Sequence, residues 1–98
     1  MSTFKQLEAD LFDGVVVFTS KNCGPCARVK PMLEQICDKH AVPLIALDIH
    51  ENIDAARALG LRGAPSVVVM ELGAGENIHT GDTTSTALFE KLRNAGAL

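Results

Sequence analysis

The 98-residue chain lacks three features, and each absence excludes a class of protein. Its longest apolar runs, such as Val15 to Phe18 and Val67 to Met70, are far too short to span a bilayer. Its nine Lys and Arg residues are scattered and the formal net charge is −3, so the basic stripe typical of nucleic-acid binding is missing. The first residues carry acids and no long apolar region, which predicts neither a signal peptide nor a membrane anchor.

Cysteine is scarce as well. The three cysteines, an odd number with one close pair, do not form the even framework of a small secreted scaffold. They favour a reducing compartment, and we expect a cytoplasmic protein that binds neither nucleic acid nor membrane. With 47% hydrophobic residues, the chain is long enough to bury one core without metal or disulfide staples, so residues 1–98 are expected to form a single domain.

The order of apolar patterns along the chain predicts an α/β fold. The run from Val15 to Thr19 is β-branched without alternation, which is typical of a strand covered on both faces and therefore implies helices on both sides of a sheet. The expected elements are a helix over 4–13 carrying Phe4, Leu7 and Leu11, a strand over 15–19, a helix over 24–40, a strand over 42–48, a short helix over 53–59, two antiparallel strands over 66–70 and 76–80, and a last helix through 87–92.

The ends of these elements carry recognisable capping and turn residues. Ser2 or Thr3 is expected to cap the first helix, Asn52 the third and either Asp82 or Thr83 the last, because their side chains can accept hydrogen bonds from the free N–H groups there. The turn between the two final strands is expected to contain both Gly73 and Gly75.

Residues 23–26 read Cys-Gly-Pro-Cys, at the point where an apolar run ends and a helical pattern begins. If the spacer forms a helical turn, Cys23 lies at the helix N-terminus, where unpaired N–H groups and the helix dipole stabilise a thiolate. Cys26 then lies one turn further, within disulfide reach. The pattern predicts a redox switch in which Cys23 attacks a substrate sulfur and Cys26 resolves the mixed disulfide.

A lone Cys-x-x-Cys also supplies half of a zinc site, but the other half is not evident here. Cys37 lies eleven residues beyond Cys26, which is roughly 16 Å along one helix and too far for a disulfide or a shared metal. We interpret Cys37 as a small buried packing residue. His40, His50 and His79 are scattered over different elements, and no metal ligand is assigned.

Cys-Gly-Pro-Cys between a strand and a helix is the active-site motif of the thioredoxin family, and the resemblance extends from about Val15 to Leu92. Pro31 falls where the family kinks its active-site helix. The segment from Arg62 to Pro65 resembles the family's cis-proline segment, and Gly81 follows that proline by sixteen residues, as in thioredoxins. The resemblance implies a thioredoxin fold with a central four-stranded mixed sheet flanked by helices, shortened by the absence of the extra N-terminal strand.

The resemblance also implies a substrate platform. Pro65 would be cis and pack against the thiol pair, while the Ala64 backbone would pair with an extended substrate segment. No bound cofactor is implied, and a flavoprotein reductase using NADPH would recharge the dithiol. The residues expected to form the turn and the shallow platform around the cysteines are Gly24, Pro25, Gly63, Ala64, Pro65 and Gly81.

The sequence departs from the family at three points. The family's tryptophan-rich approach to the motif is replaced by Thr19 to Asn22, and the chain has no Trp at all. The buried acid that assists proton removal from the resolving thiol is replaced by Val17, and the lysine usually near it corresponds to Ala46. Cys26 must therefore lose its proton to water, to the departing thiolate or to another group.

These features together predict a monomeric protein-disulfide reductase. Its expected substrates are disulfide-containing proteins, and it would donate electrons to a cytoplasmic enzyme such as ribonucleotide reductase. One alternative is a glutathione-linked, glutaredoxin-like protein. Another is a binding module that is not an enzyme, either an iron–sulfur or zinc carrier using Cys23 across a dimer, or an accessory subunit that docks on a larger enzyme.

Overall fold

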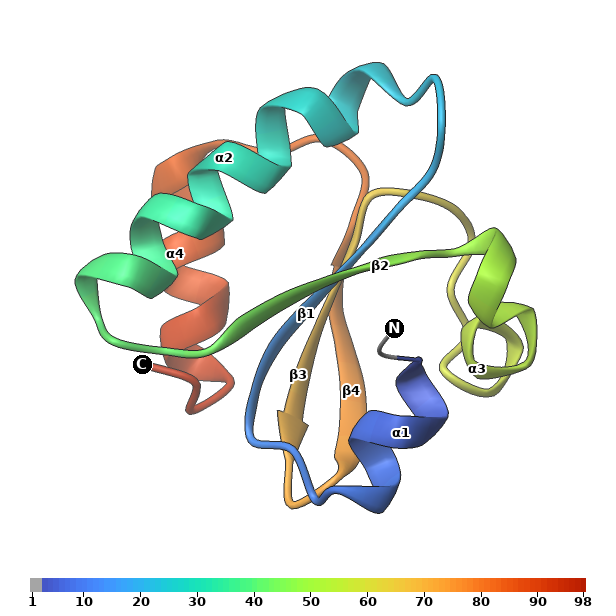
Figure 1. The fold of residues 1–98 in the computed structure, drawn as a ribbon. Helices are drawn as coiled ribbons and strands as arrows, with labels where there is room; N and C mark the ends of the chain where they lie inside the picture. The colour runs from blue at the N-terminus through green and yellow to red at the C-terminus, as the bar shows by residue number, and fades with distance from the viewer. Residues whose placement is uncertain (1–2) are drawn as a thin grey trace.

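The computed structural model describes residues 3–98 and shows a four-stranded mixed sheet with helices on both faces (Figure 1). The strands lie in the order β2-β1-β3-β4, with β1 parallel to β2 and antiparallel to β3, and with β3 and β4 forming an antiparallel hairpin. The elements are α1 Phe4–Ala9, β1 Gly14–Thr19, α2 Gly24–Lys39, β2 Leu44–Asp48, a 3-10 turn η1 His50–Asn52, α3 Ile53–Ala58, β3 Ser66–Glu71, β4 Ala74–Thr80 and α4 Ser85–Asn94.

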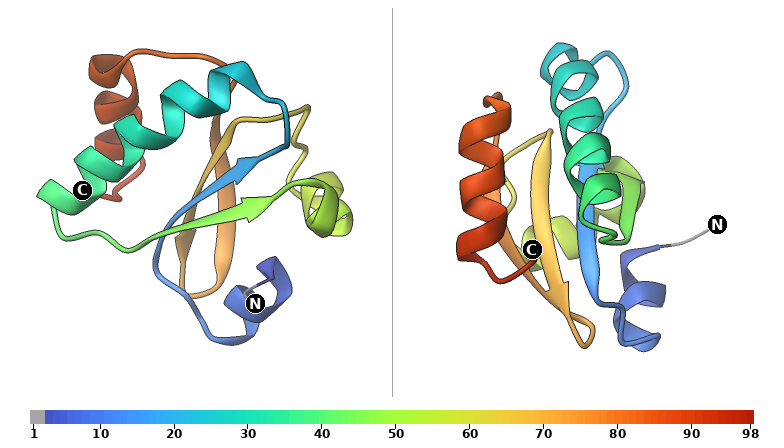
Figure 2. Two further views of the ribbon diagram at one scale, coloured as in Figure 1. Left: turned by 45° about the horizontal axis from the view of Figure 1, so that its top comes forward. Right: turned by 90° about the vertical axis from the view of Figure 1, so that its left-hand side faces the viewer.

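The central strand β1 is covered on both faces, as its β-branched run predicts. Val15 and Val17 pack in a cluster with side chains of α2 and α4, while Val16 and Phe18 pack in a second cluster with α1 and α3. All four are fully buried. Figures 1 and 2 show α2 and α4 on one side of the sheet and α1 and α3 on the other.

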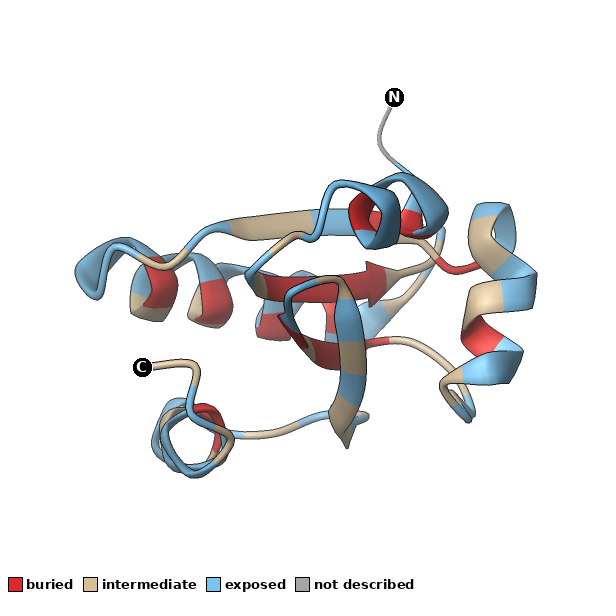
Figure 3. Ribbon diagram, turned by 90° about the horizontal axis from the view of Figure 1, so that it is seen from below, coloured by how far each residue is buried: buried red, intermediate tan, exposed pale blue. Residues whose placement is uncertain are grey.

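Burial is concentrated on β1 and β3, the two inner strands, and on one stripe of each long helix (Figure 3). In α2 the buried residues are Cys26, Val29, Leu33 and Cys37, with Ile36 partly buried beside them, and this confirms the apolar face expected from the sequence. Pro31 lies inside this helix, also as expected. In the part of the chain that the structure describes, no helix is long and apolar enough to cross a membrane.

The first helix is shorter than predicted, and Leu11 is not on its buried face. The helix ends at Ala9 because the N–H groups of Leu11 and Phe12 turn back to the carbonyls of Glu8 and Leu7. Leu11 adopts a left-handed backbone with φ 54°, which leaves its side chain 60% exposed, whereas Phe12 packs against the core.

Two of the expected helix caps are also wrong. Asn52 precedes α3, but its side chain bonds elsewhere: Oδ1 accepts the N–H of Phe4 and Nδ2 donates to the carbonyl of Asp48. Asn52 thereby joins the start of α1 to the end of β2. The cap of α4 is Thr84, whose hydroxyl accepts the Ala87 N–H, instead of Asp82 or Thr83. The cap of α1 is Thr3, as predicted; Ser2 lies outside the described residues.

Gly75 is not part of the hairpin turn, although Gly73 is. The turn consists of Leu72 and Gly73, both with positive φ, between the paired residues Glu71 and Ala74. Gly75 lies within β4, where a Cβ atom would come within 2.9 Å of the Phe4 ring. Its lack of a side chain therefore allows α1 to pack closely on the sheet.

Candidate functional site

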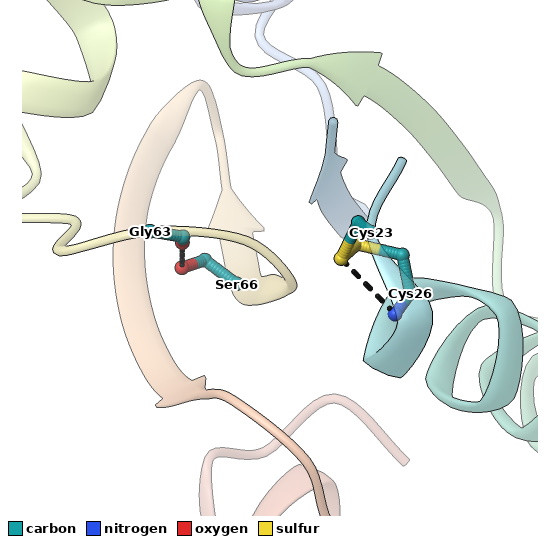
Figure 4. The surroundings of a disulfide bond; sticks show 4 residues. All are labelled: Cys23, Cys26, Gly63 and Ser66. Carbon is teal, nitrogen blue, oxygen red and sulfur yellow. Dashed lines mark hydrogen bonds between the residues drawn. A yellow bond between two sulfur atoms is a disulfide. The ribbon is translucent and has the colours of Figure 1, made fainter. Parts of the chain in front are cut away.

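The sheet register places the two segments of the site at the same end of the inner strands β1 and β3. Phe18, near the end of β1, is the partner of Ser66, the first residue of β3. The loop that follows β1 and leads to Cys23 therefore starts beside the loop that contains Pro65 and leads into β3. Figure 4 shows the second loop directed toward the cysteine pair.

Cys23 occupies the N-cap position of α2 and is bonded to Cys26, with their Cα atoms 5.3 Å apart. The Cys23 sulfur also accepts the backbone N–H of Cys26 at 3.2 Å (Figure 4). Gly24 and Pro25 form the first turn of the helix and are exposed. A sulfur at this position receives both a direct N–H contact and the positive end of the helix dipole, which stabilise its thiolate form.

The two cysteines differ in access. Cys23 is partly exposed, whereas Cys26 is buried, with 6% of its surface accessible. The Cys23 sulfur is thus the more accessible of the two; the roles of Cys23 as attacking thiol and Cys26 as resolving thiol remain a prediction.

A shallow open hollow lies beside the disulfide on the side of the β1–α2 connection. Both cysteines contribute to its wall. The lining side chains from the β1–α2 connection are small and polar, and one lining side chain from α2, Lys30, is charged. The lining residues are Thr19, Ser20, Asn22, Cys23, Gly24, Cys26, Ala27 and Lys30.

The predicted platform residues are brought together at the opposite side of the site. The Ala64–Pro65 peptide bond is cis, and Pro65 is buried at the start of β3. The Gly81 N–H donates to the Pro65 carbonyl at 2.8 Å, so the turn after β4 is fastened to the Gly63–Pro65 loop. Gly63, Ala64, Pro65 and Gly81 thus form one continuous unit. Their role in binding substrate remains a prediction.

A directed chain of hydrogen bonds supports this loop, and the sequence reasoning missed it. Ser66, which is fully buried, donates its hydroxyl hydrogen to the Gly63 carbonyl at 2.6 Å (Figure 4). Since that hydrogen is committed, the Thr80 hydroxyl must be the donor in its 3.0 Å contact with Ser66 Oγ. Thr80 Oγ1 in turn accepts from the Asn77 side-chain amide at 3.2 Å. The sequence carries one sign of this chain: Ser66, a polar residue, stands directly after Pro65 and just before an apolar run.

The turn between β4 and α4 is held by His79, a residue to which the sequence gave no role. His79 Nε2 lies 3.1 Å from the carbonyls of Gly81 and Asp82, and its Nδ1 lies 2.6 Å from Lys91 Nζ. Because carbonyl oxygens only accept, Nε2 carries the proton and Nδ1 accepts from Lys91. His79 therefore positions the turn that contains Gly81.

Asp82 joins the same turn to α2 through an ion pair with Arg28. Hydrogen bonding from the Arg28 side chain lowers the pKa of the Asp82 carboxyl, and the Thr83 N–H contributes in the same direction. The carboxylate is therefore charged at neutral pH. Because both side chains are well exposed, the pair orients the turn and adds little to stability.

Behind the cysteines the protein is apolar. Val17, at the position of the family's buried acid, is fully buried, and its partner on β2 is Ala46, which is exposed. Neither can take up the Cys26 proton.

Cys37 is a buried free thiol in the core between α2, α4 and the sheet, as interpreted from the sequence, and burial raises its pKa. Residues 3–98 contain no group of three or more His, Cys, Asp and Glu side chains placed to hold a metal ion.

The disulfide spans one helical turn, its Cys23 sulfur is partly exposed, and it lies at the ends of the inner strands of a mixed α/β sheet. This arrangement defines a thiol-disulfide oxidoreductase. A family model for thioredoxin matches residues 2–94, and the chain therefore belongs to the thioredoxin family. Members of this family are disulfide oxidoreductases.

Individual relatives agree with this assignment. Thioredoxin 1 from Nostoc sp. is 29% identical over 94 residues, which cover 93% of this chain and 88% of that protein. Thioredoxin from Bacillus subtilis is 27% identical over 93 residues, covering 91% of this chain and 89% of the relative. NADPH-dependent thioredoxin reductase 3 from Arabidopsis thaliana is 40% identical over 55 residues, which cover 54% of this chain but 10% of that protein.

The hydrogen-bond chain through Ser66 yields a stability prediction. Ser66→Ala removes the donor to the Gly63 carbonyl, and we expect the free energy of unfolding to fall by about 1–3 kcal/mol because a part-buried carbonyl loses its partner. Urea unfolding of the oxidised protein measures the change. Ser85→Ala, at an exposed position in α4, is the control and should leave stability within about 0.5 kcal/mol of the wild type. Equal stability of the two variants would contradict a role for the chain.

The burial of Cys37 yields a prediction of reactivity. Because burial raises the pKa of this thiol, it stays protonated at neutral pH, and native oxidised protein should take up no iodoacetamide. The same protein unfolded in guanidinium chloride without reductant should take up one equivalent, at Cys37. Mass spectrometry measures both. Rapid labelling of the folded, oxidised protein would show that Cys37 is not shielded as the structure indicates.

Proposed function

We propose that this protein reduces disulfides of other proteins in a reducing, cytoplasmic compartment. The observation that carries the proposal is the Cys23 sulfur, which sits at the N-cap of α2, accepts the Cys26 N–H and is more exposed than Cys26. The Cys23 thiolate attacks a substrate sulfur, so that a mixed disulfide forms and one substrate thiolate leaves. Cys26 then attacks Cys23, the second substrate thiolate leaves, and the protein retains the disulfide.

We propose further that substrate is bound by backbone pairing on the Gly63–Pro65 loop, next to Gly81. The loop lies at the same end of the two inner strands as the cysteines and is fastened by the Gly81 bond to Pro65 and the Ser66 bond to Gly63. An extended segment carrying a disulfide can pair with the backbone of this loop at Ala64, because main-chain pairing tolerates different side chains. An enzyme such as ribonucleotide reductase, which must be re-reduced after each turnover, is a substrate of this class.

For the electron donor we propose a flavoprotein reductase that uses NADPH, without a cofactor bound to this chain. The partial match to a plant NADPH-dependent thioredoxin reductase supports this choice, since 55 residues of that protein resemble this chain. The protein is proposed to act as a monomer, with Cys23 and Cys26 contributed by the same chain.

Cysteine substitutions test the reaction. Cys23→Ser should abolish the reduction of insulin disulfides, because the attacking thiol is lost, and Cys26→Ser should accumulate mixed disulfides that survive non-reducing electrophoresis. Cys37→Ala is the matched control and should retain activity, because Cys37 is buried away from the site. Insulin reduction by Cys23→Ser at the wild-type rate would overturn the proposed function.

Donor preference tests the proposed source of electrons. Oxidised protein is supplied either with NADPH and a thioredoxin reductase or with glutathione, NADPH and glutathione reductase, and oxidation of NADPH is followed by absorbance with insulin as acceptor. Turnover is expected with thioredoxin reductase and only background with glutathione. Efficient turnover with glutathione alone would instead identify a glutathione-linked redoxin.

A further inference from the structure

We propose that Lys30 is the charged group that favours the thiolate of Cys26 in the resolving step, and that water in the adjoining hollow takes the proton. This inference rests on the proposed function. It addresses how the second thiol is activated in a protein that has the buried apolar Val17 at the position of the family's acid and Ala46 beside it on β2.

The position of Lys30 on α2 directs it toward Cys26. The two residues are four apart, so they are neighbours on one helix face, about 6 Å apart along the axis. Side chains on a helix lean toward its N-terminus, so the Lys30 chain extends over the turn that contains Cys26. Both residues line the hollow beside the disulfide, which is independent evidence that they share one environment.

The hollow gives Cys26 its contact with solvent. Cys26 is otherwise buried, and the walls next to it are formed by small polar residues of the β1–α2 connection, Thr19, Ser20 and Asn22. No aromatic side chain is among the lining residues, so the hollow stays open. Water there can accept the Cys26 proton directly, and the hydroxyl and amide groups offer it further hydrogen bonds.

Lys30 is the one charged side chain among the eight residues that line the hollow. Within residues 3–98 it takes part in no ion pair, so its charge is not neutralised by a carboxylate. A neighbouring ammonium group lowers the pKa of a cysteine thiol by favouring its charged form.

Of the other charges near this end of α2, Lys21 lies in the β1–α2 connection two residues before Cys23 but does not line the hollow, and the rest are paired elsewhere or lie further away. Arg28 is paired with Asp82 of the β4–α4 turn. Asp48, opposite Thr19 at the end of β2, accepts the N–H groups of His50 and Glu51. Strand β1 carries no charged residue. On α4, Lys91 bonds His79, while Glu90 and Arg93 are exposed. The other charged residues of α2 lie one or more turns beyond Lys30: Glu34, Asp38 and Lys39.

The resolving step is balanced with these groups. The Cys26 thiol gives its proton to water, and the resulting thiolate, stabilised by the Lys30 ammonium, attacks the Cys23 sulfur. The Cys23–Cys26 bond forms, the bond between Cys23 and the substrate sulfur breaks, and the substrate leaves as a thiolate that takes up a proton from solvent. Lys30 keeps its own proton throughout.

The test follows the two steps separately. Reduced protein is mixed with the neutral reagent 4,4′-dithiodipyridine in a stopped-flow instrument; attack by Cys23 releases the first thiopyridone, and resolution by Cys26 releases the second. In Lys30→Met the apparent pKa of the second phase should rise by about half a unit, because one favourable charge is lost. The second phase should be slower below that pKa but not slower above it, because a thiolate of higher pKa is the better nucleophile.

Matched variants separate charge from structure. Lys30→Arg should restore the wild-type profile. Lys39→Met removes a lysine from the same helix, about 20 Å from Cys26 along the axis, and should leave both phases unchanged. In the wild type, raising the salt concentration should shift the second phase toward the Lys30→Met profile, and this measurement does not depend on the folding of any variant.

Several outcomes would overturn the role of Lys30: an unchanged second phase in Lys30→Met, slowing by the same factor at every pH, an equal shift in the first phase, no rescue by Lys30→Arg, or no effect of salt on the wild type. Each of these leaves the proposed function intact, because both phases are still present. A wild-type protein that releases no thiopyridone from Cys23 would instead contradict the proposed function itself.

Discussion

The pairing of β1 with both of its neighbours is the interaction on which the rest of this structure depends. Burial of Val15 to Phe18 on the two faces of the sheet requires helices on both sides, and these helices complete the two halves of the core. The register with β3 then fixes the site, because the partner of Phe18 is Ser66. Strand pairing thus holds the ends of two distant chain segments together without any contact between groups of the active site.

The polar groups around the site have one arrangement in common. Each loop is held through its backbone by a side chain two or three residues away in the sequence: Ser66 holds the Gly63 carbonyl, His79 holds the carbonyls of Gly81 and Asp82, and Asp48 holds the turn after β2. None of these bonds uses a cysteine. The loops that surround the disulfide are therefore held by bonds that do not depend on the redox state of the cysteines.

Three features could be predicted from the sequence: the fold class, the antiparallel hairpin of β3 and β4, and the position of the cysteine pair. Each of them depends on a local pattern or a specific motif. The β-branched run at β1 and the apolar stripe of α2 are examples. Two of the wrong predictions failed because of distant partners. Asn52 suits a helix cap but bonds Phe4, 48 residues away, and Gly75 resembles a turn glycine but makes room for the Phe4 ring. Leu11 fits the helical spacing, yet the helix closes before it. The hollow at Lys30 was not predicted either, because its shape depends on how the β1–α2 connection folds against the first turns of α2.

The unequal access of the two sulfurs also bears on oxidative damage. A small oxidant such as peroxide that enters the site reaches Cys23 before the buried Cys26. Oxidation of Cys23 to a sulfenic acid leaves the Cys26 thiol one helical turn away, close enough to condense with it, release water and form the disulfide. Because the disulfide is a normal state of this protein, the geometry diverts Cys23 from irreversible over-oxidation into a form that a reductase can recover.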